Sequence, residues 1–339
     1  MIDTVVVSVT KIVVLLLVLL LSIAYLVLLE RKVMAWVQVR LGPMRVGTHG
    51  LLQPIADVLK LLVKEDITPS KANRWVFTLA PVMAVVPALL VFAVIPLGGE
   101  TTLFGRSFTW YVADVNVALL YIVSVSSIGL YGLILGGWAS NSKYPMISSL
   151  RVSAQLVSYE VAVTMTLVSL ILMSGTLSMV GIVKAQLAAG VWYVFLQPLA
   201  FGIYFIGGLA ETNRAPFDLP EAESELTGGF HTEYSGIRFA LFFLAEYANM
   251  IVVSSVATTL FLGGWLRPFP NIAWLSVLDI VPGLVWFIAK TFLFLFVFLW
   301  VRATLPRYRY DQLMRLGWKV LIPLAIANVM LTATLKVLL

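Results

Sequence analysis

The chain has 339 residues, of which 60% are hydrophobic and only 12% charged, and its mean hydropathy is +0.98. This composition excludes an ordinary water-soluble protein and indicates an integral membrane protein. The sequence contains no cysteine and only two histidines, His49 and His231, both in polar segments. We therefore expect no metal site in this chain, no iron–sulfur cluster, no haem within the membrane and no cofactor bound by the chain alone.

Nearly uncharged stretches of about 20 residues, the length of a membrane-spanning helix, recur along the chain. Strands of a membrane barrel would alternate polar and apolar residues, so these stretches are expected to be helices. The predicted fold is all-α, a single polytopic membrane domain over residues 1–339. We expect the first span to be retained, because its apolar run is too long for a signal peptide. The eight predicted spans are 5–29, 75–97, 113–137, 153–175, 192–210, 238–262, 282–304 and 318–338.

The distribution of Lys and Arg predicts the orientation, because cytoplasmic loops collect positive charge. The odd-numbered loops between these spans hold seventeen basic residues, and the even-numbered loops hold three, namely Arg106, Lys184 and Arg267. We therefore expect both termini on the outer side and loops one, three, five and seven on the cytoplasmic side. The net charge of +6 reflects this topology, and we expect no nucleic-acid partner.

The first loop contains an amphipathic segment, which is predicted to be a helix lying along the membrane surface. One function for such a helix is to anchor the loop. The other is to form a floor for a molecule that enters from the lipid. The apolar positions with helical spacing are Leu51, Leu52, Ile55, Val58, Leu59, Leu62 and Val63.

Loop five is acidic, although it is expected on the side that normally carries positive charge. Apolar residues lie between its acids, which indicates burial rather than a solvated loop. Carboxylates crowded in a partly buried site raise one another's pKa towards neutrality, as a proton relay requires. The alternative is a charged docking surface for a soluble partner. The acids are Glu211, Asp218, Glu221, Glu223, Glu225 and Glu233.

Ionisable residues inside spans are costly and therefore candidates for function. From the predicted span ends, Glu160 lies about 10 Å deep, Glu246 about 12 Å and Lys290 about 18 Å. A buried salt bridge is the alternative, but three acids, with Glu211 at the border, are not neutralised by one lysine. We expect a proton route from loop five through Glu211 to the other three residues, continuing sideways into another subunit. Loop seven, which begins at Arg302, mixes basic and aromatic residues, as in a stop-transfer cluster or in a protein or quinone interface.

Several segments together resemble one family, the NuoH family of membrane subunits of proton-pumping NADH:quinone oxidoreductase, or respiratory complex I. Its mitochondrial counterpart is NADH dehydrogenase subunit 1. The resemblance covers about residues 30–319, and the loop-five string is the most specific. The segments are ERKVMAWVQVRLGP (30–43), GLLQPIAD (50–57), GWASNSKY (137–144), QLVSYE (155–160), ETNRAPFDLPEAE (211–223) and RYRYDQLM (307–314).

The resemblance implies a subunit that joins the peripheral arm of the enzyme to its membrane arm, in a bacterial inner membrane. Quinone is the implied substrate, whereas FMN and the iron–sulfur clusters belong to partner subunits. The implied partners are the peripheral-arm subunits of the quinone site, the neighbouring membrane subunits and the lipid bilayer. The implied quinone-chamber residues are Arg31, Arg45, Asp57 and Arg302. The implied proton channel comprises Glu160, Glu211, Asp218, Glu221, Glu223, Glu225 and Glu246.

Two positions depart from the family pattern: Met44 stands where Asn is usual, and Ser148 where Gly is common. A related subunit of membrane-bound hydrogenase or formate hydrogenlyase complexes is the closest alternative. The intact strings PFDLPE (216–221) and HTEYSG (231–236) favour the quinone enzyme instead. A stand-alone secondary transporter would show paired broken spans in two halves, and the sequence does not show this pattern.

Overall fold

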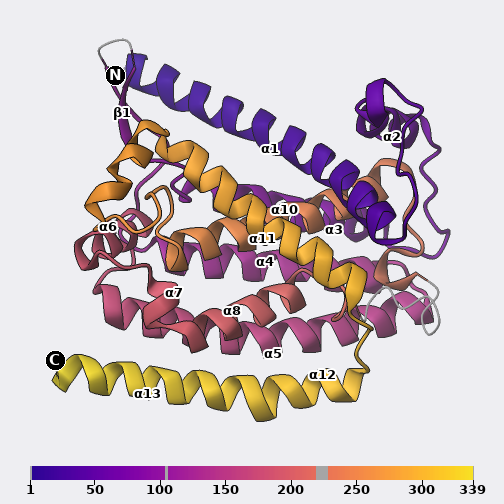
Figure 1. Ribbon diagram of the computed structural model, residues 1–339. Coiled ribbons are helices and arrows are strands. Elements are labelled where there is room, and N and C mark those ends of the chain that lie inside the picture. The colour runs from indigo at the N-terminus through magenta and orange to yellow at the C-terminus, as the bar shows by residue number, and fades with distance from the viewer. Residues whose placement is uncertain (1, 104–105, 219–227, 339) are drawn as a thin grey trace.

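The computed structural model describes residues 2–103, 106–218 and 228–338, and helices make up most of this chain (Figure 1). Among these residues, seven helical segments are long and apolar enough to cross a membrane. The predicted all-α polytopic fold is thus confirmed, with one small addition. This addition is an antiparallel hairpin of β1 (Glu100–Leu103) and β2 (Arg106–Thr109).

The long helices follow the predicted spans closely, although several extend beyond the hydrocarbon-length window at one end. In chain order they are α1 (Ile2–Val37), α3 (Arg74–Leu90), α4 (Ala118–Ala139), α5 (Lys143–Ser174), α10 (Gly236–Phe261), α11 (Gly283–Thr304) and α13 (Ile322–Leu338). The last is continuous with α12 (Tyr310–Leu316) through the π-turn η5 (Gly317–Leu321). Shorter helices are α2 (Gln53–Val63) and α6 (Met179–Ala189), with the 3-10 turns η1 (Thr48–Gly50), η2 (Val91–Ala93), η3 (Gly229–His231) and η4 (Ala273–Ile280).

The stretch 192–210, predicted as a single span, forms two helices, α7 (Tyr193–Leu196) and α8 (Pro198–Glu211). Pro198 has no backbone N–H to continue a helix, and Gln197 before it adopts a non-helical conformation. The Gln197 amide is bound on both sides by α13, accepting from Asn328 Nδ2 at 2.9 Å and donating to Thr332 Oγ1 at 2.8 Å. The break is thus fixed by buried polar contacts.

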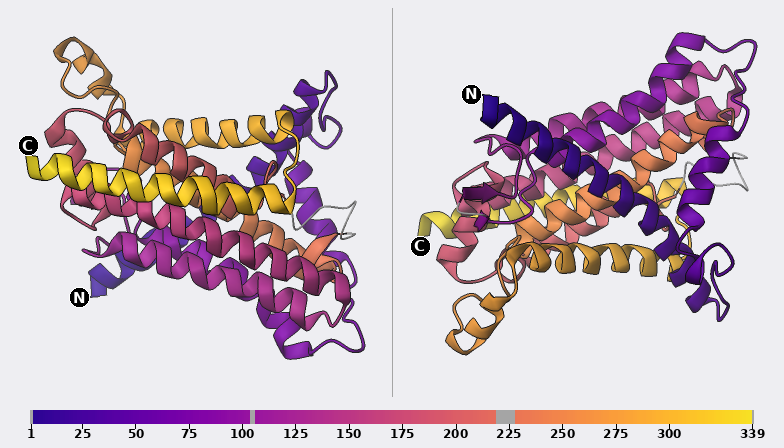
Figure 2. Two further views of the ribbon diagram at one scale, coloured as in Figure 1. Left: turned by 90° about the horizontal axis from the view of Figure 1, so that it is seen from below. Right: turned by 90° about the horizontal axis from the view of Figure 1, so that it is seen from above.

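The helices pack side by side as a bundle, and α1 crosses it obliquely (Figures 1 and 2). Leu19, Ile23 and Leu26 of α1 are buried. Val6 and Val13, nearer its N-terminus, are 57% and 50% exposed. The second half of α1 therefore packs more closely against the bundle than the first half does. The C-terminal end of α1 is held where α10 and α11 meet it.

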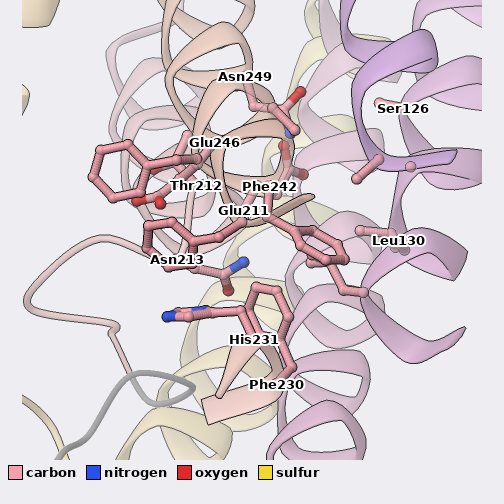
Figure 3. A pocket seen from close by; sticks show the side chains of 16 residues that line it. Ser126, Leu130, Glu211, Thr212, Asn213, Phe230, His231, Phe242, Glu246 and Asn249 are labelled. Atoms are coloured by element: carbon pink, nitrogen blue, oxygen red, sulfur yellow. The ribbon is translucent and has the colours of Figure 1, made fainter. Parts of the chain in front are cut away.

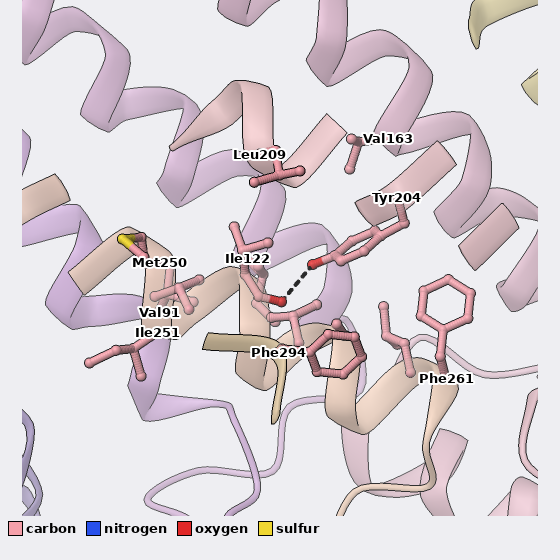
Figure 4. Close-up of a cluster of buried hydrophobic side chains, with 14 of the residues drawn as sticks. Val91, Ile122, Val163, Tyr204, Leu209, Met250, Ile251, Phe261 and Phe294 are labelled. Atoms are coloured by element: carbon pink, nitrogen blue, oxygen red, sulfur yellow. Dashed lines mark hydrogen bonds between the residues drawn. The ribbon is translucent and has the colours of Figure 1, made fainter. Parts of the chain in front are cut away.

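Most of the large buried side chains are apolar, although Ser, Thr and charged side chains are buried as well. Tyr204 of α8 lies among aliphatic and aromatic side chains of the neighbouring helices (Figure 4). Its hydroxyl donates to the backbone oxygen of Val253 on α10 at 3.3 Å. This contact satisfies a polar group that the core would otherwise leave unpaired.

Helix α2 confirms the amphipathic segment predicted in loop one, beginning at Gln53 with Pro54 in its first turn. It lies at the edge of the bundle, beside the C-terminal end of α1 and in contact with α10 (Figure 1). Its apolar face is uncovered: Ile55, Val58 and Leu62 are each at least half exposed. A helix that exposes such a face fits a membrane surface.

Candidate functional site

A cluster of buried charges gathers where loop five meets α1 and α10. Arg214 and Glu30 are almost fully buried, and Arg214 Nη1 lies 3.0 Å from Glu30 Oε1. Arg214 Nε lies 2.5 Å from Glu246 Oε1 on α10. Tyr247 donates its hydroxyl to Glu30 Oε2 at 2.8 Å, and its ring lies 4.3 Å beneath the Arg214 guanidinium. Arg214 thus joins two carboxylates from different helices.

A second guanidinium balances this charge cluster, because Arg302 at the end of α11 also pairs with Glu30. The cluster therefore holds two carboxylates and two guanidinium groups, as buried charges require. Burial opposes the positive charge of Arg214, but Glu246 and Glu30 outweigh it and hold the pKa of Arg214 above its ordinary value. The arrangement ties loop five to α1, α10 and α11.

Arg31, next to Glu30 on α1, pairs with Asp57 on α2 over 2.6 Å between Nη1 and Oδ2. Gln53 also donates to Asp57 Oδ1, at 2.9 Å. Consecutive residues of α1 thus bind different parts of the molecule: Glu30 the bundle, and Arg31 the surface helix. The structure brings Arg31, Asp57 and Arg302 to one end of α1, and it places Arg45 exposed in the connection between α1 and α2.

A cavity lies beside the charge cluster, between α4, α8, α10 and the loop-five segment before α10 (Figure 3). Polar groups from all of these elements line it together with phenylalanine rings. Glu211 and Glu246 contribute carboxylates, and Asn213, His231 and Asn249 contribute further polar atoms. In Figure 3 His231 and Phe230 lie at one end of the cavity and Asn249 at the other.

A second cavity adjoins the first and extends along α5 and α8. It contains Glu160, whose carboxylate accepts a hydrogen bond from Ser127 on α4. Glu211 and Asn249 line both cavities, as do Ser126 and Leu130 of α4. Three of the predicted acids therefore lie in order along neighbouring cavities: Glu246 lines the first, Glu211 lines both and Glu160 lines the second.

Loop five is also joined to loop seven. Asp218 is buried and pairs with Arg307 over 3.1 Å between Oδ2 and Nη2. Tyr308 stacks on Phe217 with 5.6 Å between ring centroids, and its backbone N–H donates to the oxygen of Pro216 at 2.9 Å. The predicted relay residues Glu221, Glu223 and Glu225 lie outside the described residues.

Lys290 does not join the acids as expected. Its ammonium donates to the backbone oxygens of Leu262, Gly264 and Leu266, at 2.6, 3.0 and 2.6 Å. These carbonyls follow the C-terminal end of α10, where a cation is favoured by unpaired carbonyls and by the helix dipole. Lys290 lines neither cavity. The sequence did not predict these contacts, because the depth of Lys290 in its span gives no information about the connection after α10.

His231 is the loop-five imidazole of the first cavity, and it lies outside the spans. It sits between aromatic rings, with 4.9 Å to Phe230 and 5.2 Å to Phe239 between ring centroids. Burial lowers the pKa of His231 to about 4, so its imidazole is neutral at physiological pH. A neutral imidazole can both donate and accept a hydrogen bond inside the cavity.

Sequence reasoning missed several members of this site. Glu30 and Arg214 were seen only as parts of longer strings, because charges near span ends are common and carry little signal by themselves. Tyr247 and Asn249 were not missed, because they follow Glu246 on α10 and the sequence marks them as polar neighbours of an intramembrane acid. Ser127 is recognisable only through its contact with Glu160.

Comparison with known proteins identifies the family. The family described as NADH dehydrogenase matches residues 10–333, nearly the whole chain. The chain belongs to the NADH dehydrogenase family. An H-type subunit of the NADH-quinone oxidoreductase of Geobacter metallireducens is 56% identical over 91% of this chain and 90% of its own length. An H-type subunit from Geobacter sulfurreducens is 51% identical over 96% of this chain and 93% of its own length.

These matches confirm the resemblance stated from the sequence. This member of the NADH dehydrogenase family is an H-type membrane subunit of NADH:quinone oxidoreductase, and its hydrophobic helices agree with that assignment. Family membership by itself assigns no role to single residues. Those roles are proposed below from the geometry of the site.

Proposed function

We propose that this subunit forms the membrane side of the quinone chamber of NADH:quinone oxidoreductase and the beginning of a proton channel. The channel starts at the charge cluster of Glu30, Arg214 and Glu246 and continues through Glu211 to Glu160. The observation that carries this proposal is the pair of neighbouring cavities that share Glu211 in their lining. Carboxylates separated by polar, water-sized spaces can pass protons between them.

The contacts at the end of α1 support the chamber. The exposed apolar face of α2 suits an isoprenoid tail, and the Arg31–Asp57 pair and Arg302 place charge beside the polar end of such a molecule. Arg45 lies in the connection between these elements. Helix α2 would then serve as the floor rather than only as an anchor.

Loops five and seven contact each other through Asp218, Arg307 and Tyr308, and they form a surface suited to the peripheral-arm subunits. In the proposed assembly these subunits supply FMN and the iron–sulfur cluster that reduces quinone, while further membrane subunits receive protons sideways. We propose a bacterial inner membrane location with both termini outside. The seventeen-to-three division of basic residues between odd and even loops supports this orientation.

The decisive experiment replaces Glu211 with Gln in the assembled complex. Glu211→Gln preserves the shape of the side chain but cannot exchange a proton, so quinone-dependent proton pumping in inverted vesicles should fall by about tenfold or more. NADH oxidation by a soluble artificial acceptor should remain normal, because that reaction does not require the membrane channel. Glu100→Gln, at the exposed first residue of β1, is the matched control. Normal pumping per quinone reduced in Glu211→Gln would exclude the residue from the channel.

A further inference from the structure

A separate pocket lies where the connection between α10 and α11 folds back against α6. Its apolar walls include Leu187, Leu266, Leu278 and Val281. Figure 2 shows that this connection projects from the end of the bundle that also carries the N-terminus, opposite α2. With the proposed orientation, the pocket opens at the outer surface of the membrane, far from the quinone chamber.

Three polar side chains, Arg267, Asp279 and Trp286, also line this mainly apolar pocket. Arg267, which is 13% exposed, pairs through Nε with Asp279 Oδ1 at 3.0 Å, and its Nη2 donates to the backbone oxygen of Pro270 at 3.0 Å. Arg267 Nη1 and Trp286 Nε1 are shielded from water, and neither has a hydrogen-bond partner in the described part of the chain. Buried N–H groups are normally satisfied, so both point to a missing acceptor.

We propose that this pocket binds the headgroup of a phospholipid that carries a primary ammonium, of the phosphoethanolamine type. When the Arg267 and Trp286 side chains turn towards the pocket that they line, the phosphate accepts hydrogen bonds from Arg267 Nη1 and Trp286 Nε1. The ammonium pairs with Asp279, whose side chain is 61% exposed. A headgroup with a negative charge alone would meet that carboxylate unfavourably, whereas a zwitterionic headgroup matches both charges.

The surface beside the pocket suits the acyl chains. Val285, Ile288 and Phe292 follow on α11 and are 49%, 57% and 47% exposed, so an apolar strip runs from the pocket into the lipid-facing surface. Trp and Arg side chains at the end of a span are typical of the membrane interface. A free phosphate ion would use none of this strip, which favours a lipid as the source of the phosphate.

Photolabelling of the purified complex tests this site. The probe is phosphatidylethanolamine with a photoactivatable group in its acyl chain near the headgroup, and the labelled peptides are identified by mass spectrometry. We expect labelling at the start of α11 and about tenfold weaker labelling in Arg267→Gln, since a charge-assisted hydrogen bond is lost. Trp286→Phe removes only the indole N–H, leaves an aromatic ring in place, and should weaken labelling several-fold.

Asp279→Asn tests the contact with the ammonium separately from the contact with the phosphate. This variant should still be labelled, but it should lose the preference for phosphatidylethanolamine over the matching phosphatidylcholine probe, whose quaternary ammonium donates no hydrogen bond. Lys184→Gln, an exposed charge on α6, is the matched control and should be labelled like the unmodified complex.

Three outcomes would overturn the proposal. The first is unchanged labelling in both Arg267→Gln and Trp286→Phe. The second is equal labelling by phosphatidylethanolamine, phosphatidylcholine and phosphatidylglycerol probes in the unmodified complex. The third is full competition by millimolar inorganic phosphate, which would show a free-anion site instead of a lipid site. Native gels of each variant distinguish loss of the site from loss of assembly.

Discussion

Arg214 of loop five and Glu246 of α10 form an ion pair in which Nε and Oε1 are 2.5 Å apart. The same guanidinium binds Glu30 of α1, so one side chain connects loop five with two long apolar helices. Any movement of loop five is therefore transmitted to a carboxylate that lines the first cavity. This gives a direct physical connection between the proposed quinone chamber and the start of the proposed proton channel.

Arg214→Gln should reduce the amount of assembled complex. The change leaves the carboxylates of Glu30 and Glu246 buried with Arg302 as their remaining cation, and an uncompensated buried charge costs about 3–5 kcal/mol. Adding Glu246→Gln in the same chain removes one of those charges and should restore part of the assembly. The measurement is the yield of complex on native gels.

The matched control for this charge removal is Arg309→Gln, because Arg309 is largely exposed and its partner among the described residues is the exposed Asp311. This variant should assemble normally. If Arg214→Gln also assembled at the normal level, the cluster would contribute little to stability, and its charges would have to be solvated in the assembled enzyme.

Glu160→Gln should give an assembled complex with quinone-coupled turnover reduced by about tenfold or more, because the amide cannot exchange a proton. Glu160→Asp should keep part of the activity, since the titratable group remains with a shorter reach. Proton pumping in inverted vesicles and complex assembly on native gels are measured together.

A structural role for Glu160 predicts a different result. In that case Gln would lower assembly, and Ser127→Ala, which removes the hydroxyl that donates to Glu160, would lower it in the same way. Neutralising Lys290 should not rescue either variant, because Lys290 binds the carbonyls after α10 and not Glu160. A fully active Glu160→Gln enzyme would remove this residue from the proposed channel.

His231 should make the complex less stable in mild acid. Its folded-state pKa is about 4, whereas a free histidine titrates near 6.5, so between these values the unfolded chain binds more protons. Above pH 6.5 this group therefore has no effect on the free energy of unfolding. As the pH falls towards 4, the free energy of unfolding decreases, by about 2 kcal/mol at pH 5. His231→Gln should reduce the drop in the thermal inactivation midpoint between pH 7.5 and pH 5.

The exposed His49 gives the control for this pH effect, and Asn is a suitable replacement because residue 49 has a positive φ of 54°. His49→Asn should keep the full acid sensitivity. Equal acid sensitivity in His231→Gln and the unmodified complex would show that other groups dominate, such as the carboxylates of the charge cluster.

Hydropathy was sufficient to predict most of this fold, because a helix that spans the membrane needs about 20 consecutive, mostly apolar residues, which the sequence shows directly. The break at Gln197 was not predicted, although Pro198 marked it, because the apolar window continues across both helices. Helix α6 was missed for a related reason. It has only 11 residues, and an apolar stretch of that length does not distinguish a helix from a connection.

The residues of the candidate site were likewise predictable only in part. Glu160, Glu211 and Glu246 were predictable because an acid within an apolar stretch is costly and therefore conspicuous. The partners of these acids depend on which helices meet, and the sequence carries no direct signal of that. Glu30 was missed as the partner of Arg214, because the two residues are 184 positions apart in the sequence. Lys290 was grouped with the acids, although its ammonium binds backbone oxygens of the connection after α10.

Arg302→Ala should raise the apparent KM for a long-tailed quinone several-fold. Arg302 lies at the end of α11, where it pairs with Glu30 beside the Arg31–Asp57 pair and the exposed apolar face of α2. Assembly should persist, because Arg214 still pairs with both Glu30 and Glu246, and because water can reach the place of the Arg302 side chain, which is 28% exposed, whereas Arg214 is 4% exposed. NADH oxidation by a soluble artificial acceptor should also stay normal, since it bypasses the chamber. Arg315→Ala, on the exposed side of α12, is the control. Equal loss in the quinone and artificial-acceptor assays would indicate misassembly, and an unchanged KM would place the quinone path away from Arg302.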